Sequence, residues 1–186
     1  MRSFIGIDFN TDIKNEIYEL QQRIRKYAVK GRWKYIDNFH LTLKFLNEIS
    51  LSQQAQIDAI MKKVCINKKP FNLKLTEPGI FEGKDSVRVL WLGLEGDIQP
   101  LHSLQKEIDK ALNSIGFSLE KRKFKPHITI GQDIVFEHEF DQIKKTLENI
   151  LIQPIPVESL FLFKSEQIQN KRIYTKVSEY SFSKII

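Results

Sequence analysis

Runs in which apolar and polar residues alternate recur along this chain and predict β-strands over much of its length. Alternation sends successive side chains to opposite faces of a sheet, so that one face is buried and the other is not. We expect strands over residues 4–9, 39–46, 71–76, 87–94, 127–130, 157–164 and 173–177. Between them, apolar residues repeat at helical spacing and predict helices over residues 11–28, 52–66, 98–115 and 140–151.

The order of these elements indicates a duplicated α+β fold, because the pattern of the first half largely recurs in the second. Thr11 and Ser52 suit the starts of the first two helices, and Gly116 suits the end of the third. No Pro- or Ser-rich tract and no low-complexity segment marks a boundary. We therefore expect residues 1–186 to fold as a single domain.

The composition and charge of the chain indicate a class of binding partner but do not identify a particular one. The chain has 186 residues, 41% of them hydrophobic, and a net charge of +6, which favours an anionic partner such as RNA. Cys65 is the only cysteine, so no disulfide can form within the chain, and a reducing, cytoplasmic location fits. No apolar run approaches the length needed to span a bilayer, so we expect no membrane insertion.

One four-residue pattern, His-x-Thr-x with apolar x, occurs twice, as HLTL at 40–43 and HITI at 127–130. In a strand, the His and Thr of each copy share one face while the aliphatic residues share the other. Two such strands facing each other would supply one imidazole to take a proton, one to give a proton, and two hydroxyls to hold an anion. This set of groups can open a phosphodiester without a metal.

A structural role is the competing interpretation of each motif, because a single His and Thr on a half-buried strand most often form a hydrogen-bonded pair. Duplication favours function, since two of only four histidines occupy the same place in matching tetrapeptides. His102 and His138 have no such setting, and we expect them on the surface. Neither copy has the His-x-x-x-His spacing or the Cys and carboxylate cluster of a zinc site, so we expect no metal and no other cofactor.

Further segments around the motifs support an assignment to a family. They are FIGID at 4–8, NFHLTLKFL at 38–46, RVLWLGL at 88–94 and GFSLEKRKFKPHITI at 116–130. Together they resemble the 2H phosphoesterase superfamily, and within it the RNA 2′,3′-cyclic phosphodiesterases historically called 2′-5′ RNA ligases. The resemblance implies a bilobal, pseudo-symmetric fold. Each lobe would be a mainly antiparallel sheet with helices outside, and the two would share a central cleft that carries the His-x-Thr-x strands.

The resemblance also implies an activity, the hydrolysis of a 2′,3′-cyclic phosphate at an RNA or nucleotide end to a 2′-phosphate. It assigns His127 as the proton acceptor, His40 as the proton donor, and Thr42 and Thr129 as ligands of the nonbridging oxygens. Joining of 2′-5′ ends is a possible side activity of such an enzyme, but no nucleotide-cofactor loop that would drive ligation is present. A monomer is expected, because one chain would supply both lobes of the cleft.

Two basic residues are further candidates for substrate binding. Lys44 lies two positions beyond Thr42 and shares its face if the strand stays regular, although a solvated lysine at a strand end is an equal alternative. The resemblance suggests that Arg122 forms part of the site, and the alternative is an ion pair with Glu120 on the same side of an extended segment.

Aromatic residues near the ends of elements that lead to the cleft are candidates for stacking on a base. We expect Phe9 and Trp33 to contact the terminal base without reading its identity, and we treat Trp91 as structural. After the second motif many members of the family have Ala-Arg, whereas this chain has Gly131 and Gln132, so a phosphate-binding arginine is missing. Lys44 or Arg122 could compensate.

A different class of function also fits this composition. The chain could be an RNA-end-binding module that has lost catalysis and uses a basic cleft and aromatic rings to hold its ligand. The presence of both histidines and both threonines argues against that alternative.

Overall fold

The computed structural model describes residues 1–147 and 153–182 and consists of two antiparallel sheets with helices. The strands are β1 Arg2–Asp8, β2 Ala28–Trp33, β3 His40–Glu48, β4 Phe71–Glu82, β5 Val87–Gly96, β6 Ile128–Phe136, β7 Ile155–Val157, β8 Ser159–Ile168 and β9 Lys171–Ser181. The helices are α1 Thr11–Arg25, α2 Leu51–Cys65, α3 Ile98–Asn113 and α4 Phe140–Lys145, with the 3₁₀ turn η1 at Ile36–Asn38.

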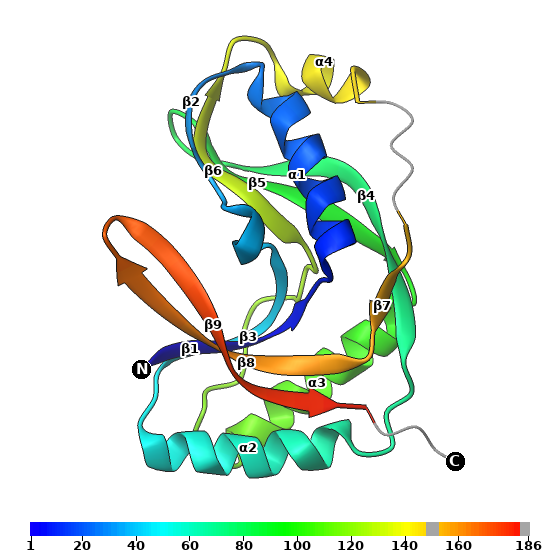
Figure 1. Cartoon of the computed structure of the whole chain (residues 1–186), viewed down its shortest axis with the longest axis vertical. Coiled ribbons are helices and arrows are strands. Elements are labelled where there is room, and N and C mark those ends of the chain that lie inside the picture. Colours follow the sequence, from blue (N-terminus) through cyan, green and yellow to red (C-terminus); the bar gives the residue numbers. More distant parts are fainter. Residues whose placement is uncertain (148–152, 183–186) are drawn as a thin grey trace.

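The chain passes from one sheet to the other several times, so neither sheet is built from one continuous stretch of sequence. The first sheet has the order β3-β1-β8-β9 and the second has the order β2-β6-β5-β4-β7. Figure 1 shows the first sheet in the lower half of the molecule and the second in the upper half, with β3 and β6 near the junction. Each half of the molecule is therefore assembled from both the N-terminal and the C-terminal parts of the chain.

Helices cover the outer sides of the two sheets, as the sequence predicted. Helix α1 lies along the second sheet, whereas α2 and α3 lie together beneath the first (Figure 1). The Asn10 side chain caps α1 by accepting a hydrogen bond from the Ile13 amide at 2.9 Å. Gly116 follows α3 with φ of 97°, a backbone conformation that favours glycine, so the predicted end of that helix is confirmed.

The structure differs from the sequence prediction mainly in β2. We expected the first helix to reach residue 28, but it ends at Arg25, and Ala28–Trp33 form a strand. Strand β2 lies at the edge of the second sheet and buries no side chain fully, so it lacks the apolar alternation that identifies other strands. The short strand β7 was also missed. Helix α4 ends at Lys145, and the end of the predicted helix 140–151 falls partly outside the described residues.

No helix in the described part of the chain is long and apolar enough to cross a membrane. Cys65, at the end of α2, is buried, and burial raises the pKa of its thiol to about 12. A thiol in that environment stays protonated and unreactive at neutral pH.

Candidate active site

Both His-x-Thr-x motifs lie on strands that meet at the junction of the two sheets. His40 is the first residue of β3, His127 immediately precedes β6, and these two strands lie against each other. In each motif the His and Thr are half-buried, whereas the aliphatic residues are buried in the core. The predicted division of each motif into a polar face and an apolar face is therefore confirmed.

The two histidines are anchored in the same way. In each, ring atom Nδ1 lies 2.7 Å from a carbonyl oxygen two residues earlier, that of Asn38 for His40 and that of Lys125 for His127. Because a carbonyl can only accept a hydrogen bond, Nδ1 must carry the hydrogen in both rings. The neutral tautomer then has its lone pair on Nε2, so Nε2 is the atom of each ring that can take up a proton.

His40 and Thr42 are coupled within the first motif. The Nε2 atom of His40 lies 2.9 Å from the Thr42 hydroxyl oxygen. While His40 is neutral, the hydroxyl donates to Nε2. When His40 is protonated, Nε2–H donates instead, and the hydroxyl hydrogen of Thr42 becomes free to point at a negatively charged ligand.

The environment of His40 disfavours the charged imidazole. Burial lowers its pKa from 6.5 to about 4, and the positive charges of Lys34 and Lys14 act in the same direction. The hydrogen bond to the Asn38 carbonyl and the negative charge of Asp8 oppose this shift but do not offset it. His40 is therefore neutral at neutral pH in the ligand-free protein.

Asp8 pairs with His40 across β1 and β3 and is held by two lysines. Its carboxylate lies 2.8 Å from Lys14 Nζ and 2.6 Å from Lys176 Nζ. Burial alone would raise the pKa of Asp8, but these two hydrogen-bonded ammonium groups lower it below its usual value. Asp8 thus remains ionised, and its charge is already balanced by lysines.

A β-bulge follows the threonine in both motifs. Against β1, Lys44 pairs with Ile5 and Thr42 pairs with Gly6, so Leu43 is left without a partner. Against β5, Gly131 pairs with Leu90 and Thr129 pairs with Trp91, so Ile130 is the extra residue. A bulge shifts the phase of the strand by one residue. The residue after each motif, Lys44 or Gly131, therefore turns to the buried face.

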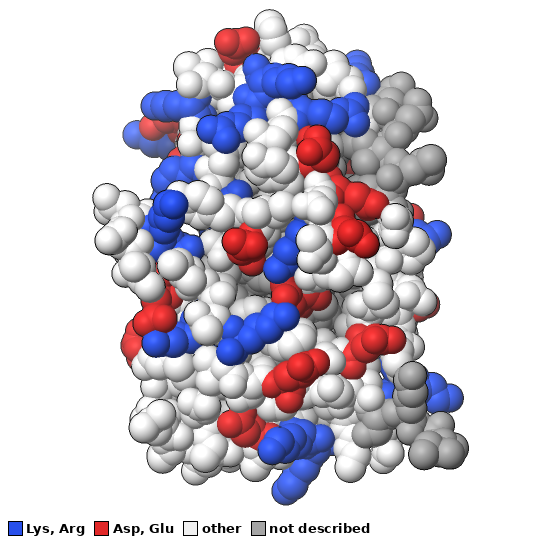
Figure 2. All heavy atoms as spheres, viewed as in Figure 1, with Lys and Arg blue, Asp and Glu red and all other residues white. Residues whose placement is uncertain are grey.

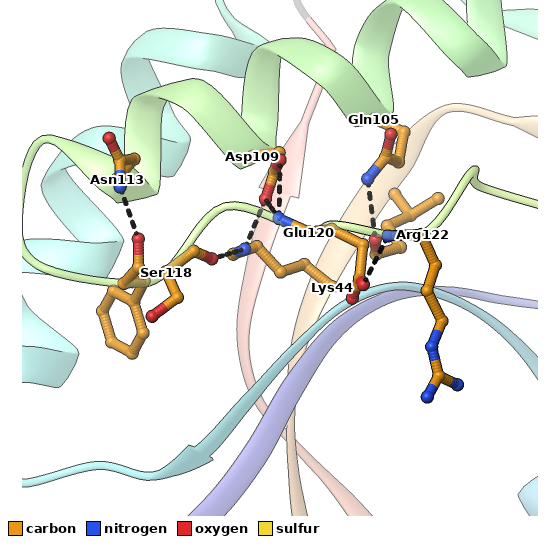
Figure 3. A network of polar contacts seen from close by, with 9 residues as sticks. Lys44, Gln105, Asp109, Asn113, Ser118, Glu120 and Arg122 are labelled. Atoms are coloured by element: carbon orange, nitrogen blue, oxygen red, sulfur yellow. Dashed lines mark hydrogen bonds and ion pairs between the residues drawn. The ribbon is translucent and has the colours of Figure 1, made fainter.

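The bulge makes the predicted role of Lys44 wrong. Its side chain is 6% exposed and points away from the face that carries Thr42. The ammonium group forms an ion pair with Asp109 of α3 and donates to the Ser118 carbonyl at 2.8 Å (Figure 3). Asp109 also accepts a hydrogen bond from the Glu120 amide. Lys44 thus fixes the segment that leads to the second motif and is not available to a phosphate.

Arg122 is exposed and lies on that same segment. Its backbone amide donates to the Glu120 carboxylate at 3.1 Å, and its guanidinium points away from the Lys44 network (Figure 3). The alternative ion pair between Glu120 and Arg122 is not formed among the described residues. The Arg122 guanidinium has no ion-pair partner in residues 1–147 and 153–182, and its substrate-binding role stays a prediction.

A buried glutamine supports the bulge of each motif. Gln21 of α1 donates to the carbonyl of Ile130 at 2.8 Å, and Gln105 of α3 lies 3.5 Å from the carbonyl of Leu43. Both carbonyls belong to the unpaired residues of the bulges, which need a donor because they are buried. Gln21 and Gln105 carry no catalytic chemistry themselves, and no motif in the sequence singled them out.

The rings beside the two histidines are not those that the sequence singled out. His40 contacts Phe4 and Tyr174, with centroid distances of 4.7 and 4.9 Å. His127 contacts Phe81 and Trp91, with centroid distances of 5.3 and 6.3 Å. Phe4 and Trp91 belong to β1 and β5, which pair with the motif strands, whereas Tyr174 of β9 and Phe81 of β4 lie farther across the same sheets. Only the arrangement of strands in each sheet identifies these rings.

Neither predicted base contact is placed beside a histidine. Phe9 is 5% exposed and belongs to the core, because the chain turns there into α1, so its predicted contact with a base is wrong. Trp33 packs against the core with the Arg25 guanidinium 5.9 Å from its ring. Its ring lies beside Gly131, on the buried side of β6. Lys34, the residue after Trp33, was not among the predicted site residues, although its positive charge lowers the pKa of His40.

Charge is mixed over the face drawn in Figure 2, where basic and acidic side chains surround a hollow near the middle. The net positive charge therefore forms no single basic tract on that face.

No group of three or more His, Cys, Asp or Glu side chains converges as metal ligands within residues 1–147 and 153–182.

Comparison with known proteins adds a family to this geometry. The family model described as the 2′-5′ RNA ligase superfamily matches residues 12–168. The chain belongs to this superfamily. A member from Thermotoga maritima, named RNA 2′,3′-cyclic phosphodiesterase, is 35% identical over 160 residues, which are 84% of this chain and 81% of that protein. A member of the same name from Methanocaldococcus jannaschii is 30% identical over 183 residues, 97% of this chain and 100% of that one.

The fold of the superfamily is shared as well. The crystal structure of Escherichia coli LigT complexed with 3′-AMP matches with a TM-score of 0.77 at 25% identity, over 98% of each chain. The predicted α+β fold with two antiparallel sheets is confirmed.

Proposed function

We propose that this protein hydrolyses RNA 2′,3′-cyclic phosphate ends to 2′-phosphomonoesters by metal-independent acid/base catalysis with two histidines. The observation that carries the proposal is the matching anchorage of His40 and His127 through Nδ1, which makes Nε2 the proton-exchanging atom of each ring, shared in His40 with the Thr42 hydroxyl. The relatives named RNA 2′,3′-cyclic phosphodiesterase support the substrate.

In the proposed reaction a water molecule attacks the phosphorus of the cyclic ester. His127 Nε2 takes a proton from that water as the new O–P bond forms. The P–O3′ bond breaks, and His40 Nε2–H gives a proton to the departing 3′ oxygen, so that the phosphate stays on the 2′ oxygen. The hydroxyls of Thr42 and Thr129 donate hydrogen bonds to the nonbridging oxygens.

The lowered pKa of His40 has a consequence for this scheme. A proton donor must hold its proton when the substrate is bound, yet His40 is neutral in the free protein. The negative cyclic phosphate favours the imidazolium, because an opposite charge close to a histidine raises its pKa. Protonation also releases the hydroxyl hydrogen of Thr42 toward the phosphate. Substrate binding and protonation of His40 therefore promote each other.

We further propose that residues 1–186 form one domain that acts as a monomer in the cytoplasm. The repeated passage of the chain between the two sheets supports a single folding unit, and one chain supplies both histidines. The buried, reduced Cys65 suits a reducing compartment.

Phosphorus NMR of a short RNA that ends in a 2′,3′-cyclic phosphate, incubated with the protein with and without excess EDTA, tests the function. We expect a 2′-phosphate from the parent protein and from His138→Ala, whose exposed histidine lies outside the site. His40→Ala and His127→Ala should lose activity by about 100-fold or more, the usual range for a general acid or base.

Each outcome of that experiment has a definite meaning. A 3′-phosphate product would overturn the assignment of the leaving group. Loss of activity with EDTA would overturn the metal-independent mechanism. No turnover by the parent, together with binding of the same RNA, would instead support an RNA-end-binding module.

A further inference from the structure

Lys34 occupies a position between the two motifs. It directly follows β2, its amide donates to the Ile130 carbonyl at 3.1 Å, and its own carbonyl accepts a hydrogen bond from Gln21 at 2.8 Å. These bonds fix its backbone beside the second motif. Its Nζ lies 5.9 Å from the ring centroid of Tyr174, and that ring packs edge-on against His40. The side chain therefore reaches across to the first motif.

The surroundings of Lys34 are positive. Its pKa is lowered because burial penalises the ammonium ion and because Arg32 and Arg172 lie nearby. Arg32 is paired with Asp133, but neither Lys34 nor Arg172 forms an ion pair with any described residue. A half-buried cation among other cations, with no carboxylate partner, is stabilised most by an anionic ligand.

No cation directly follows the second motif, and Lys125, two residues before His127, places its Nζ over the Trp91 ring at 4.7 Å from the centroid. The bulge at Ile130 turns Gly131 to the core, and the next residue, Gln132, is neutral. Lys44 is committed to Asp109. Of the two basic candidates Lys44 and Arg122, Arg122 alone has no ion-pair partner in the part of the chain that the structure describes, and it lies on the exposed segment before the motif.

We infer that Lys34 binds a nonbridging oxygen of the scissile phosphate and supplies the positive charge that Gln132 cannot. This inference rests on the proposed function and deepens it, because it identifies the residue that neutralises the substrate. In the free protein the Lys34 charge opposes protonation of His40. A bound phosphate lies between the two groups, balances Lys34 and stabilises the imidazolium, so one anion satisfies both.

The first test compares Lys34→Met and Lys34→Arg with Lys30→Met, a matched change at an exposed lysine of β2. The two substrates are adenosine 2′,3′-cyclic phosphate, which has no upstream phosphate, and an ApA dinucleotide with the same cyclic end. We expect Lys34→Met to lower kcat/KM roughly 10- to 100-fold on both, Lys34→Arg to retain most activity, and Lys30→Met to match the parent.

Other results would overturn the inference. Equal losses in Lys34→Met and Lys30→Met would show a general effect of surface charge. A loss only on the dinucleotide would place Lys34 at an upstream phosphate. If the parent turns over neither substrate, the proposed function fails. Calorimetric binding of inorganic phosphate then tests the role of Lys34 without any turnover. We expect Lys34→Met to bind phosphate about tenfold more weakly than the parent. Equal binding by the two proteins would overturn the inference.

The second test follows the titration of His40 by NMR in the ligand-free protein, which a purely structural role of Lys34 would not alter. The charges that act on His40 are Lys34, Lys14 and Asp8, and the Tyr174 ring packs against it. Removing the Lys34 charge should raise the pKa of His40, whereas Lys30→Met should leave it unchanged. An unchanged value in folded Lys34→Met would show that the ammonium group does not face the site.

Discussion

The side-chain amide of Gln21 donates a hydrogen bond to the Ile130 carbonyl at 2.8 Å, although the two residues are 109 positions apart. The same amide also donates to the Lys34 carbonyl at 2.8 Å. One buried glutamine thus holds the bulge of the second motif and the backbone of the lysine that we assign to the phosphate. Gln105 approaches the Leu43 carbonyl from α3, so the two halves of the site are supported in equivalent ways.

We expect Gln21→Met to lower the free energy of unfolding by about 2 kcal/mol, because the carbonyls of Ile130 and Lys34 each lose the hydrogen bond from the glutamine while the side-chain volume is kept. The Ile130 carbonyl retains the Lys34 amide as a donor. The value of kcat should fall as well, since the second motif is no longer held in place. Urea denaturation and steady-state kinetics measure both effects. Gln56→Met, at an exposed position of α2, is the control and should match the parent. A loss of stability with unchanged kinetics would restrict Gln21 to a structural role.

Lys44→Met should destabilise the protein by about 3 kcal/mol, because it leaves the Asp109 carboxylate, 13% exposed, without its buried partner. Adding Asp109→Asn should recover most of that loss. Asparagine carries no charge but still accepts the hydrogen bond from the Glu120 amide. Urea denaturation of the single and double variants checks the prediction. The double variant should also keep kcat/KM near the parent value, and a large loss would restore Lys44 as a substrate ligand.

Stability should depend on pH through His40. Its pKa is about 4 in the folded protein and near 6.5 when unfolded, so between these values the unfolded state binds more protons. Stability is therefore complete above pH 6.5 and decreases as the pH falls toward 4, by about 3 kcal/mol from this group. His40→Gln, which cannot titrate, should reduce the slope of unfolding free energy against pH in this window. An identical slope in variant and parent would contradict the burial of His40.

The assignment of donor and acceptor can be tested with a cyclic substrate in which sulfur replaces the 3′ bridging oxygen. A thiolate leaves without being protonated, so the variant that lacks the proton donor should regain activity. We expect His40→Ala to recover most of the parent rate on this substrate and His127→Ala to remain impaired. Recovery of His127→Ala alone would exchange the two roles.

Much of the fold is encoded in local pattern. Alternation located seven of the strands, and the helical spacing located the four helices of the described residues, because burial of one face imposes a period of two or of about 3.6 residues. The His-x-Thr-x pairs were identified for the same reason, since alternation alone determines that each His shares a face with its Thr. Strand β2 was missed because an edge strand with no fully buried side chain carries no such signal.

The sequence by itself therefore determined which side chains the two motifs present, and the tertiary structure decided what surrounds them. Bulges at Leu43 and Ile130 arise from pairing with β1 and β5, so no local pattern could show that Lys44 turns inward. The position of Lys34 beside His40 depends on strands of different sheets meeting at the junction. Alternation is a property of one strand, whereas register, bulges and contacts between sheets depend on hydrogen bonds and packing between segments far apart in the chain.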